Sequence, residues 1–559
     1  MAVTFSRVLV ANRGEIAIRV FRALRELGLG SVAVYSPADA GALHVRSADE
    51  AVPLRESYLD VEDVLEAARR TGAEAIHPGY GFLAENAAFA RACAEAGIVF
   101  VGPPPEAIEA MGTKVAARQR MQAAGVPFVP GTTELVTSPD EARRIGEEIG
   151  YPLALKAAAG GGGKGLRVAL SPDEVEAALA TAQREGEAYF ADGSVYVERY
   201  LDDPRHVEVQ ILADAHGNVI HLGERDCTIQ RRHQKLVEET PSPAVDPELR
   251  ERMGRLAVEA ARAVGYVSAG TVEGLLTRDG EYFFLEMNTR IQVEHTVTEL
   301  VTGIDLVHEQ LRIAQGEALS VRQEDVVLRG HAIECRINAE DVGAGFRPGP
   351  GRIRRYREPT GPGVRVDSGV EAGAEVSPLY DPLIAKLCVV DRDREAARKR
   401  MLRALSEYVV EGVPTLVGFH RALLEGPEFV AAETCRDLVE SPELAARAAE
   451  LTPSADDLPE VGGPPEEPPW AELARRRRER VRGHGHGGGE GAITSPIQGT
   501  VLSVLVAEGD AVDVGQLLCV VEAMKMENEV HAHSDGTVRD LAVTPGQQLQ
   551  AGAVICVIA

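Results

Sequence analysis

The first hundred residues alternate between short apolar runs and longer runs in which apolar residues recur every three or four positions. The short runs predict strands at 3–11, 31–35, 75–78 and 98–101, and the first longer run predicts a helix at 16–27. Gly28 directly follows this helix and is a typical helix-terminating residue. Strands that alternate with helices in this way are typical of a parallel sheet. We therefore expect an N-terminal α/β domain at 1–113.

The C-terminal segment 491–559 has a different pattern, in which short apolar runs and glycines recur with an offset of 37 residues. The repeated positions are Gly499 with Gly536, Gly509 with Gly546, Gly515 with Gly552, and the run 518–521 with 555–558. Two copies of a short-strand unit with turn glycines predict a small β-sandwich with pseudo-twofold symmetry. We expect the connection between the copies to form a hairpin tip that projects into solvent.

Between these ends, an α+β region is expected to continue to about residue 446, followed by a linker at 447–490. The linker begins with a Pro-, Glu- and Asp-rich run and ends in a Gly-His tract, compositions that are typical of flexible connections. A short basic helix at 470–482 is possible within it. That segment is either a solvated charged face or a docking helix for an acidic partner.

Composition narrows the classes of function. The length of 559 residues suits three or four domains, and 45% hydrophobic and 26% charged residues are ordinary for a soluble enzyme. The net charge of −27 argues against a nucleic-acid partner, and no apolar run approaches the length of a membrane span. Seven scattered cysteines without a CxxC pair, together with the lack of a signal-peptide pattern, indicate a cytoplasmic protein with reduced thiols.

A glycine-rich loop at 160–165 follows a short apolar strand and is flanked by Lys156 and Lys164. Glycines let backbone N–H groups close over phosphate oxygens, and lysines add positive charge. The spacing is not that of a Walker A loop, because Ala158 and Gly165 stand where that motif has Gly and Ser or Thr. From this loop alone, a flexible surface loop is an equal alternative.

A predicted hairpin places two carboxylates face to face. Two strand-like runs flank Asp279-Gly280, a strong signal for a two-residue turn. That register sets Glu273 opposite Glu286, with Asn288 two residues further on the same side. Like charges in this position destabilise a hairpin unless something compensates them. Magnesium shared with nucleotide phosphates fits best; a protonated glutamate or an arginine partner is the alternative.

Two further segments are dense in polar side chains. If the chain stays extended after the hairpin, Arg290, Gln292 and Glu294 share one face with the carboxylate pair. Such a row suits an enzyme that handles a small anion beside Mg-ATP. The run 224–235 is rich in Arg, His and Lys and suits an anion-lined cleft, with a plain surface loop as the alternative.

Lys525 has an unusual setting for a turn lysine, because it stands between Met524 and Met526. A simple solvated turn would expose both methionines for no reason. The run 522–528 closely resembles the biotin-attachment loop of biotin carboxyl carrier domains. The resemblance implies that a biotin protein ligase attaches biotin covalently to Lys525.

The rest of the chain also resembles a known family. The matching runs are 11–16, 77–86, 111–114, the glycine loop, 224–235, 286–294 and 334–341. On these runs, residues 1 to about 446 resemble biotin carboxylase, an ATP-grasp enzyme. The resemblance implies an ATP-grasp α+β domain at 114–330 with a mobile lid at about 132–203, a biotin carboxylase C-terminal domain at 331–446, and a separate all-β biotinyl (barrel-sandwich) domain at 491–559.

The resemblance also implies roles for individual residues. ATP would be held by Lys114, Lys156, Gly162, Gly163, Glu198, Leu201, His206, Gln230 and His233. Mg²⁺ or Mn²⁺ would be held by Glu273, Glu286 and Asn288. Bicarbonate would be bound by Lys235, Arg290, Gln292 and Val293 and deprotonated by Glu294, and Arg336 would stabilise the biotin enolate.

These features predict ATP-dependent carboxylation of biotin on Lys525, with bicarbonate as the source of the carboxyl group. We expect a homo-oligomer through the biotin carboxylase part that works with a separate carboxyltransferase β subunit, as the α subunit of an acetyl- or propionyl-CoA carboxylase in fatty acid biosynthesis. The alternatives are the matching subunit of a two-part pyruvate carboxylase and a biotin-carrier scaffold with an inactive ATP-grasp part. An ATP-grasp peptide or purine ligase does not account for Lys525.

Overall fold

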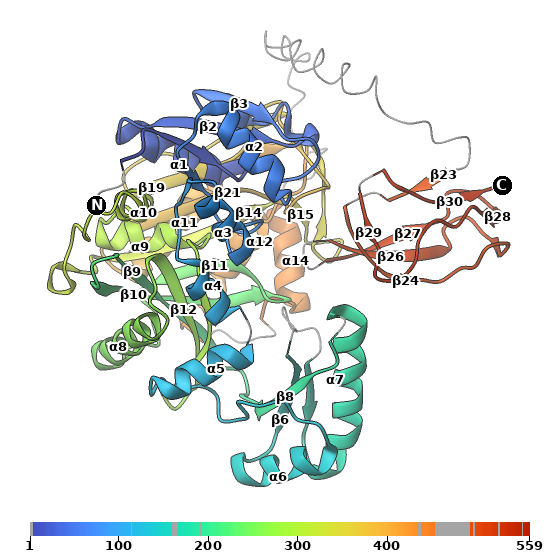
Figure 1. Ribbon diagram of the computed structural model, residues 1–559, viewed down its shortest axis with the longest axis horizontal. Coiled ribbons are helices and arrows are strands. Elements are labelled where there is room, and N and C mark those ends of the chain that lie inside the picture. The colour runs from blue at the N-terminus through green and yellow to red at the C-terminus, as the bar shows by residue number, and fades with distance from the viewer. Residues whose placement is uncertain are drawn as a thin grey trace.

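A computed structural model describes residues 4–112, 114–158, 166–190, 192–433, 438–452, 492–495, 498–523, 526–550 and 552–559. Figure 1 colours the chain from blue at the N-terminus to red at the C-terminus. Among the helices of the described part, none is both long enough and apolar enough to cross a membrane.

The N-terminal unit is the parallel α/β sheet that the hydrophobic pattern predicts. Its strand order is β3-β2-β1-β4-β5, with β1 Arg7–Val10, β2 Gly30–Tyr35, β3 Glu50–Pro53, β4 Ala75–His77 and β5 Val99–Phe100. The helices are α1 Gly14–Glu26, α2 Val61–Thr71, α3 Ala87–Glu95 and α4 Pro105–Met111. Strand β1 is buried on both faces, since Val8 and Val10 join one apolar cluster and Leu9 joins another.

An eight-stranded sheet forms the centre of the molecule, with strand order β13-β12-β9-β10-β11-β14-β21-β19. The strands are β9 Arg205–Ala213, β10 Val219–Arg231, β11 Gln234–Thr240, β12 Ser268–Leu276, β13 Tyr282–Asn288, β14 His331–Asn338, β19 Val364–Ser368 and β21 Leu383–Asp391. Strand β11 pairs directly with β14, so the expected border between residues 330 and 331 falls inside one hydrogen-bonded sheet. The ATP-grasp and C-terminal regions therefore share a continuous backbone scaffold.

Helices cover this sheet and extend its core. They are α8 Pro247–Ala263, α9 His295–Thr302, α10 Leu306–Ala314, α11 Arg394–Glu407, α12 Val417–Glu425, α13 Pro427–Val430 and α14 Pro442–Leu451. The C-terminal apolar cluster takes in Leu236 and Val237 of β11 as well as Leu405 of α11 and Phe419 of α12. Packing, like the backbone pairing, crosses the expected border.

The expected lid segment has its own sheet and core. Strands β6 Leu153–Ala157, β7 Leu166–Ala169 and β8 Val195–Arg199 pair in the order β7-β6-β8, packed by α6 Pro139–Ile149 and α7 Val175–Phe190. Helix α5, Lys114–Ala123, precedes this segment. In Figure 1 the unit projects from the main body below α5. Its movement as a lid stays a prediction.

The C-terminal segment confirms the repeat. Two four-stranded sheets have the orders β27-β26-β24-β29 and β23-β30-β28-β25, and a shift of 37 residues maps one onto the other. The strands are β23 Ala492–Thr494, β24 Gly499–Val504, β25 Ala511–Val512, β26 Leu517–Ala523, β27 Met526–His531, β28 Gly536–Arg539, β29 Gln548–Leu549 and β30 Val554–Ile558. The repeated glycines at 509, 515, 546 and 552 all have φ between 83° and 93°, which explains why glycine stands there.

Only the N-terminal end of the predicted linker lies within the described residues. Helix α14 continues to Leu451, past the expected start of the linker at 447. The segment 453–491, with the proposed basic helix at 470–482, lies outside the described residues, as do Gly162, Gly163 and Lys525. The six cysteines in the described part are free and buried, in agreement with reduced thiols.

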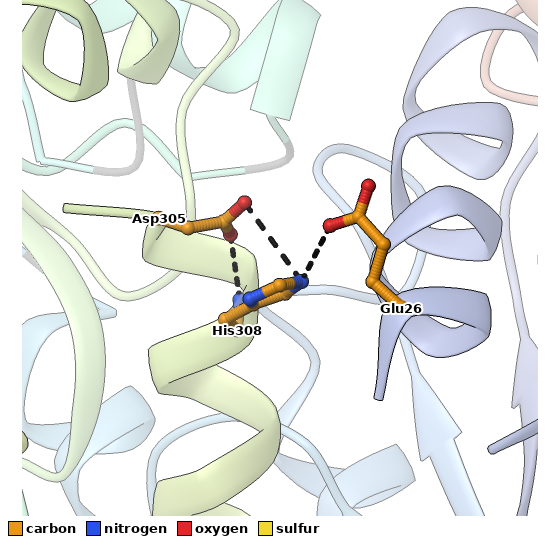
Figure 2. Close-up of side chains that lie close together, drawn as sticks. All are labelled: Glu26, Asp305 and His308. Carbon is orange, nitrogen blue, oxygen red and sulfur yellow. Dashed lines mark hydrogen bonds and ion pairs between the residues drawn. The ribbon is translucent and has the colours of Figure 1, made fainter. Parts of the chain in front are cut away.

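A polar contact links the N-terminal helix α1 to α10. His308 Nε2 lies 3.1 Å from Glu26 Oε2 and 4.0 Å from Asp305 Oδ2 (Figure 2). Asp305 also caps α10 by accepting the His308 N–H, and its Oδ1 lies 2.7 Å from Arg19 Nη2. Because Asp305 already has Arg19 and the His308 N–H as partners, we interpret the cluster as a contact between two helices.

Candidate functional site

The site lies where polar side chains leave neighbouring strands of the central sheet. His206 and Glu208 come from β9, Lys235 from β11, Glu273 from β12 and Arg336 from β14. Gln292 and Glu294 come from the segment between β13 and α9. These residues come from five separate parts of the sequence, and the pairing of the strands brings them together.

Lys235 is the centre of the cluster. Its Nζ donates to Glu208 at 2.5 Å, to Glu294 at 2.6 Å and to Glu273 at 2.9 Å. Burial alone lowers the pKa of a lysine, but the three carboxylates outweigh burial and raise the pKa of Lys235 well above its usual value. The ammonium is therefore permanently charged and is held in one position by three acceptors.

Glu294 is buried between two cations. Its Oε1 accepts from Lys235, and its Oε2 accepts from Arg336 Nη2 at 2.8 Å. Burial would raise the pKa of this carboxyl, but the charges of Lys235, Arg336 and Arg225 lower it below its usual value. Glu294 is therefore ionised and able to accept a proton.

Arg336 is shared between Glu294 and a further carboxylate, Glu238 on β11. Arg336 Nε donates to Glu238 Oε1 at 2.6 Å. Burial raises the pKa of Glu238 to about 8, although Arg336 acts in the opposite direction. Arg336 thus has two carboxylate acceptors, Glu294 in the cluster and Glu238 on β11.

The two glutamates that are expected to hold a metal ion face each other. Glu273 and Glu286 are opposite each other in the β12–β13 ladder, as predicted. Glu273 accepts from Asn288 Nδ2 at 2.7 Å and from Lys235, and its Oε2 lies 3.0 Å from His206 Nε2. Glu286 is half-buried and has no hydrogen bond or ion pair with another described residue. Two carboxylates and an amide oxygen fit the preference of Mg²⁺ for oxygen ligands.

The turn and the strand register that produce this pairing differ from the prediction. The predicted two-residue turn at Asp279-Gly280 is wrong, because Thr277 N donates to Glu281 O and encloses a three-residue turn. Near the turn Gly274 therefore pairs with Phe284. A bulge between Phe284 and Glu286 then adds one residue to β13 and restores the predicted register.

The extended row after Asn288 is also wrong in detail. Strand β13 ends at Asn288, and Glu294 has φ −81° and ψ 10° as the residue before α9. Arg290 donates to Glu85 Oε2 at 2.8 Å and to Asn288 Oδ1 at 2.9 Å. Gln292 Nε2 turns inward and donates to Glu273 Oε1 at 2.6 Å. The backbone carbonyl of Val293 accepts a hydrogen bond from the buried Lys386 Nζ at 2.9 Å.

The residues expected to bind ATP fall into two groups. Lys156 and the buried Glu198 form an ion pair on β6 and β8 of the projecting unit, and Arg118 of α5 donates to Glu198 at 2.7 Å. Leu201 lines a cavity of about 410 Å³ with Arg199 and the β12–β13 turn. Lys114 begins α5, and its side chain lies outside the described part.

The other group lies on the central sheet. His206 contacts Glu273, and although burial lowers the pKa of a histidine, that carboxylate raises the pKa of His206 above its usual value. Gln230 and Lys235 are paired across β10 and β11, and Gln230 Nε2 donates to Cys227 O. His233 is exposed in the turn between these strands, with φ 65°. The run 224–235 is therefore mostly strand, and only Arg232 and His233 in its turn are exposed, which rules out a plain surface loop.

Three carboxylates of the site escaped the sequence prediction: Glu85, Glu208 and Glu238. Each pairs with a cation that was predicted, namely Arg290, Lys235 and Arg336. A signal for Glu208 existed, because His206, Glu208 and Gln210 alternate with Val207, Val209 and Ile211. That alternation predicts a strand with one polar face.

Four family models together match most of the chain. They are the Biotin carboxylase N-terminal domain at residues 4–108, the Carbamoyl-phosphate synthase L chain ATP binding domain at 113–322, the Biotin carboxylase C-terminal domain at 334–441 and the Biotin-requiring enzyme domain at 491–558. The first three lie on the two sheets and the projecting unit, and the fourth covers the β-sandwich.

The chain is similar to a biotin-dependent acyl-coenzyme A carboxylase alpha3 subunit from Mycobacterium leprae, with 45% identity over 99% of this chain and 98% of that protein. It is similar to a pyruvate carboxylase subunit from Methanothermobacter thermautotrophicus, with 55% identity over 77% of this chain and 88% of that protein. Among solved structures, the biotin carboxylase domain of the Hydrogenobacter thermophilus 2-oxoglutarate carboxylase, a dimer in complex with MgADP, ADP and bicarbonate, has a TM-score of 0.75 and 48% identity and covers 79% of this chain and 98% of that one. The chain therefore belongs to the biotin carboxylase family and joins a biotin carboxylase to a C-terminal biotinyl domain.

Proposed function

We propose that this chain is the α subunit of an acyl-CoA carboxylase. It carboxylates biotin on Lys525 with ATP and bicarbonate, and a separate carboxyltransferase β subunit transfers the carboxyl group to acetyl-CoA or propionyl-CoA. The observation that carries this choice is the full-length similarity to the Mycobacterium leprae acyl-CoA carboxylase subunit, which spans both the carboxylase part and the biotinyl part.

A two-part pyruvate carboxylase is the second candidate. The Methanothermobacter pyruvate carboxylase subunit has the higher identity of the two, 55%, but its similarity covers 77% of this chain. The two similarities differ in coverage, 99% against 77% of this chain, and a coverage of 99% includes the biotinyl domain that is proposed to deliver the carboxyl group. The acyl-CoA assignment rests on that difference.

In the proposed site, bicarbonate binds between Lys235 and Gln292, close to Glu294. Lys235 offers a fixed positive charge, and Gln292 offers an amide N–H. Glu294 accepts the proton of bicarbonate, and the deprotonated bicarbonate oxygen becomes the nucleophile toward the terminal phosphate of ATP. The cluster thereby combines orientation of the anion with charge stabilisation, the two main contributions of proteins to phosphoryl transfer.

The nucleotide is proposed to bind between the projecting unit and the central sheet, with Lys156, Glu198 and His206 on its two sides. Glu273, Glu286 and Asn288 are the proposed ligands of Mg²⁺ or Mn²⁺, which when bound neutralises phosphate charge. Closure of 132–203 would exclude water from the site. Arg336 is the proposed contact for the ring of biotin, beside the base Glu294.

The electrostatics explain how Glu294 could be restrained until substrate arrives. A carboxylate held by two cations is a weak base. An incoming bicarbonate ion competes for the N–H groups of Lys235, and this weakens their hold on Glu294. The pKa of Glu294 then rises toward the working pH only when the anion is in place.

The lowered pKa of Glu294 predicts a pH profile. In the free enzyme, protonation of this group should not limit kcat/KM for bicarbonate above pH 4.5, its ordinary pKa, because Lys235 and Arg336 keep it ionised. In Lys235→Met the largest stabilising charge is lost while Glu208 and Glu273 remain negative, so the pKa rises and the acid limb moves to higher pH. The measurement is bicarbonate-dependent ATP cleavage against pH at a fixed concentration of bicarbonate ion.

The matched control for this experiment is Lys399→Met, because Lys399 lies on the surface of α11 and pairs with Glu395, away from the cluster. Its pH profile should overlay that of the unmodified protein. An acid limb at the same pH in Lys235→Met and in the control would contradict the proposed coupling between Lys235 and Glu294.

The function as a whole is tested with the biotinylated full-length chain. The chain should cleave ATP when bicarbonate and free biotin are both supplied, and a chain that fails to do so is an inactive scaffold. Partners are then captured on the biotinylated chain, and the complex is assayed with acetyl-CoA, propionyl-CoA and pyruvate. Carboxylation of a CoA ester is expected; carboxylation of pyruvate alone would support the second candidate.

A further inference from the structure

Arg225 on β10 is the largest fully buried side chain of the described part, and every one of its five N–H groups has an acceptor. The acceptors are Glu208 Oε1 at 2.6 Å, Gln210 Oε1 at 2.7 Å, Gln292 Oε1 at 2.8 Å, Thr298 Oγ1 at 2.9 Å and Thr271 Oγ1 at 3.2 Å. An arginine with this set of partners is held in a single orientation and also fixes its partners. The proposed mechanism does not use it directly.

One consequence concerns the side-chain amide of Gln292. Arg225 cannot be deprotonated and only donates hydrogen bonds, so the group opposite its Nη2 must be an acceptor such as an oxygen. Gln292 must turn Oε1 toward Arg225, which directs its NH₂ group to the other side. One N–H of that group donates to Glu273 Oε1 at 2.6 Å, and the second is left for a ligand. Without Arg225 the amide has no charge-based reason to prefer this orientation.

A second consequence concerns Lys235. Glu208 accepts from Arg225 with one oxygen and from Lys235 with the other, and the carboxylate is fully buried. Arg225 therefore holds the carboxylate that anchors the Lys235 ammonium. Arg225 thus sets the orientation of the Gln292 amide directly and the position of the Lys235 ammonium through Glu208. These two groups lie on either side of the proposed anion site.

We propose that Arg225 is a positioning residue for bicarbonate: it sets the donor direction of Gln292 and, through Glu208, the place of Lys235. This inference rests on the proposed function. Lys156 and Glu198 of the projecting unit lie outside the set of acceptors of Arg225, whereas Glu273 touches that set through Gln292 and Lys235. Removal of Arg225 should therefore affect bicarbonate more strongly than ATP.

The test compares Arg225→Lys, Gln292→Ala and the double variant in the full-length chain. Arg225→Lys keeps the positive charge but cannot reach all the acceptors, and we expect kcat/KM for bicarbonate to fall by about 10- to 100-fold, with a much smaller change in KM for ATP. Because part of the effect passes through Gln292, the double variant should lose less than the product of the two single losses. Equal rises in both KM values, or fully multiplicative losses, would show a merely structural role.

Thr298→Val keeps the experiment decisive if Arg225→Lys does not fold. It removes one acceptor of Arg225 from α9 and leaves Gln292 and Glu208 in place. A smaller but selective rise in KM for bicarbonate is expected, and an unchanged value would overturn the inference. An unmodified chain without bicarbonate-dependent ATP cleavage refutes the proposed function instead, so the two failures are distinguishable.

Discussion

Glu294→Gln is expected to lower bicarbonate-dependent ATP cleavage by at least about 100-fold, the scale of a lost general base. The substitution preserves the size of the side chain but removes its proton acceptor. It also turns an amide N–H toward either Lys235 or Arg336, because each of these donors faces one oxygen of the carboxylate in the unmodified protein. One of the two cations therefore loses its acceptor, which adds to the loss.

ATP binding should survive this substitution. Lys156 and Glu198 lie on the projecting unit and pair with each other rather than with Glu294, and Lys235 keeps Glu208 and Glu273 as partners. Phosphate release with and without bicarbonate measures the first effect, and nucleotide affinity measures the second. Glu395→Gln on the surface of α11 is the matched control. Activity above about one tenth of the control value would show that another group removes the proton.

The facing glutamates show what a sequence pattern can and cannot establish. An Asp-Gly turn predicts the pairing of Glu273 with Glu286, and the structure has that pairing. Yet two errors cancel, because the turn is one residue longer than predicted and a bulge adds one residue to β13. Asp-Gly suits either turn length, and the position of a bulge depends on how β12 packs against β9.

Compensation of the two charges is predictable as well, but not its source. In the structure Lys235 and His206 neutralise Glu273 from strands that are distant in sequence. Local patterns identify which side chains share a strand face; they do not identify which strands become neighbours. Glu238 escapes prediction for this reason. The alternation along β9 marks Glu208 as part of a polar face, but only the fold shows that Glu208 pairs with Lys235.

The predicted border at residue 330 lies between two sequence modules, and the two modules share one sheet. A change in sequence motifs at this point indicates a new module, but β14 adds directly to β11 and completes the same sheet. The site uses that continuity, because Arg336 on β14 reaches Glu294 from the far side of the cluster. A boundary between motifs is therefore not a boundary in the packing.

The repeat in the biotinyl domain is predictable because it is local and doubled. Each copy contains its own turn glycines, and an offset of 37 residues aligns both the glycines and the strands. Strands β26 and β27 pair up to Ala523 and Met526, and the residues between them include Lys525. Lys525 lies outside the described part, so its exposure as a hairpin tip stays a prediction.

Lys525→Arg is expected to abolish biotin attachment and, with it, carboxylation of the acyl acceptor. Lys525 is the only lysine between residues 491 and 559, so the domain has no substitute amine. Arginine keeps the positive charge, but its delocalised guanidinium does not provide the neutral amine needed to form an amide with biotin. Intact mass and streptavidin binding measure attachment, and acyl-CoA carboxylation with the captured partner measures turnover.

The decisive comparison is between biotin on the chain and biotin in solution. The cluster around Lys235 and Glu294 belongs to a different unit from β23–β30, so Lys525→Arg should leave ATP cleavage stimulated by free biotin and bicarbonate unchanged. Lys399→Arg, a surface substitution of the same type, should leave both activities unchanged. Loss of the free-biotin activity in Lys525→Arg would mean that the biotinyl domain contributes to the catalytic site itself; retained acyl-CoA carboxylation would mean that biotin is attached elsewhere. The expected pattern, with one activity lost and the other kept, requires that Lys525 carries the substrate and that the central sheet performs the chemistry.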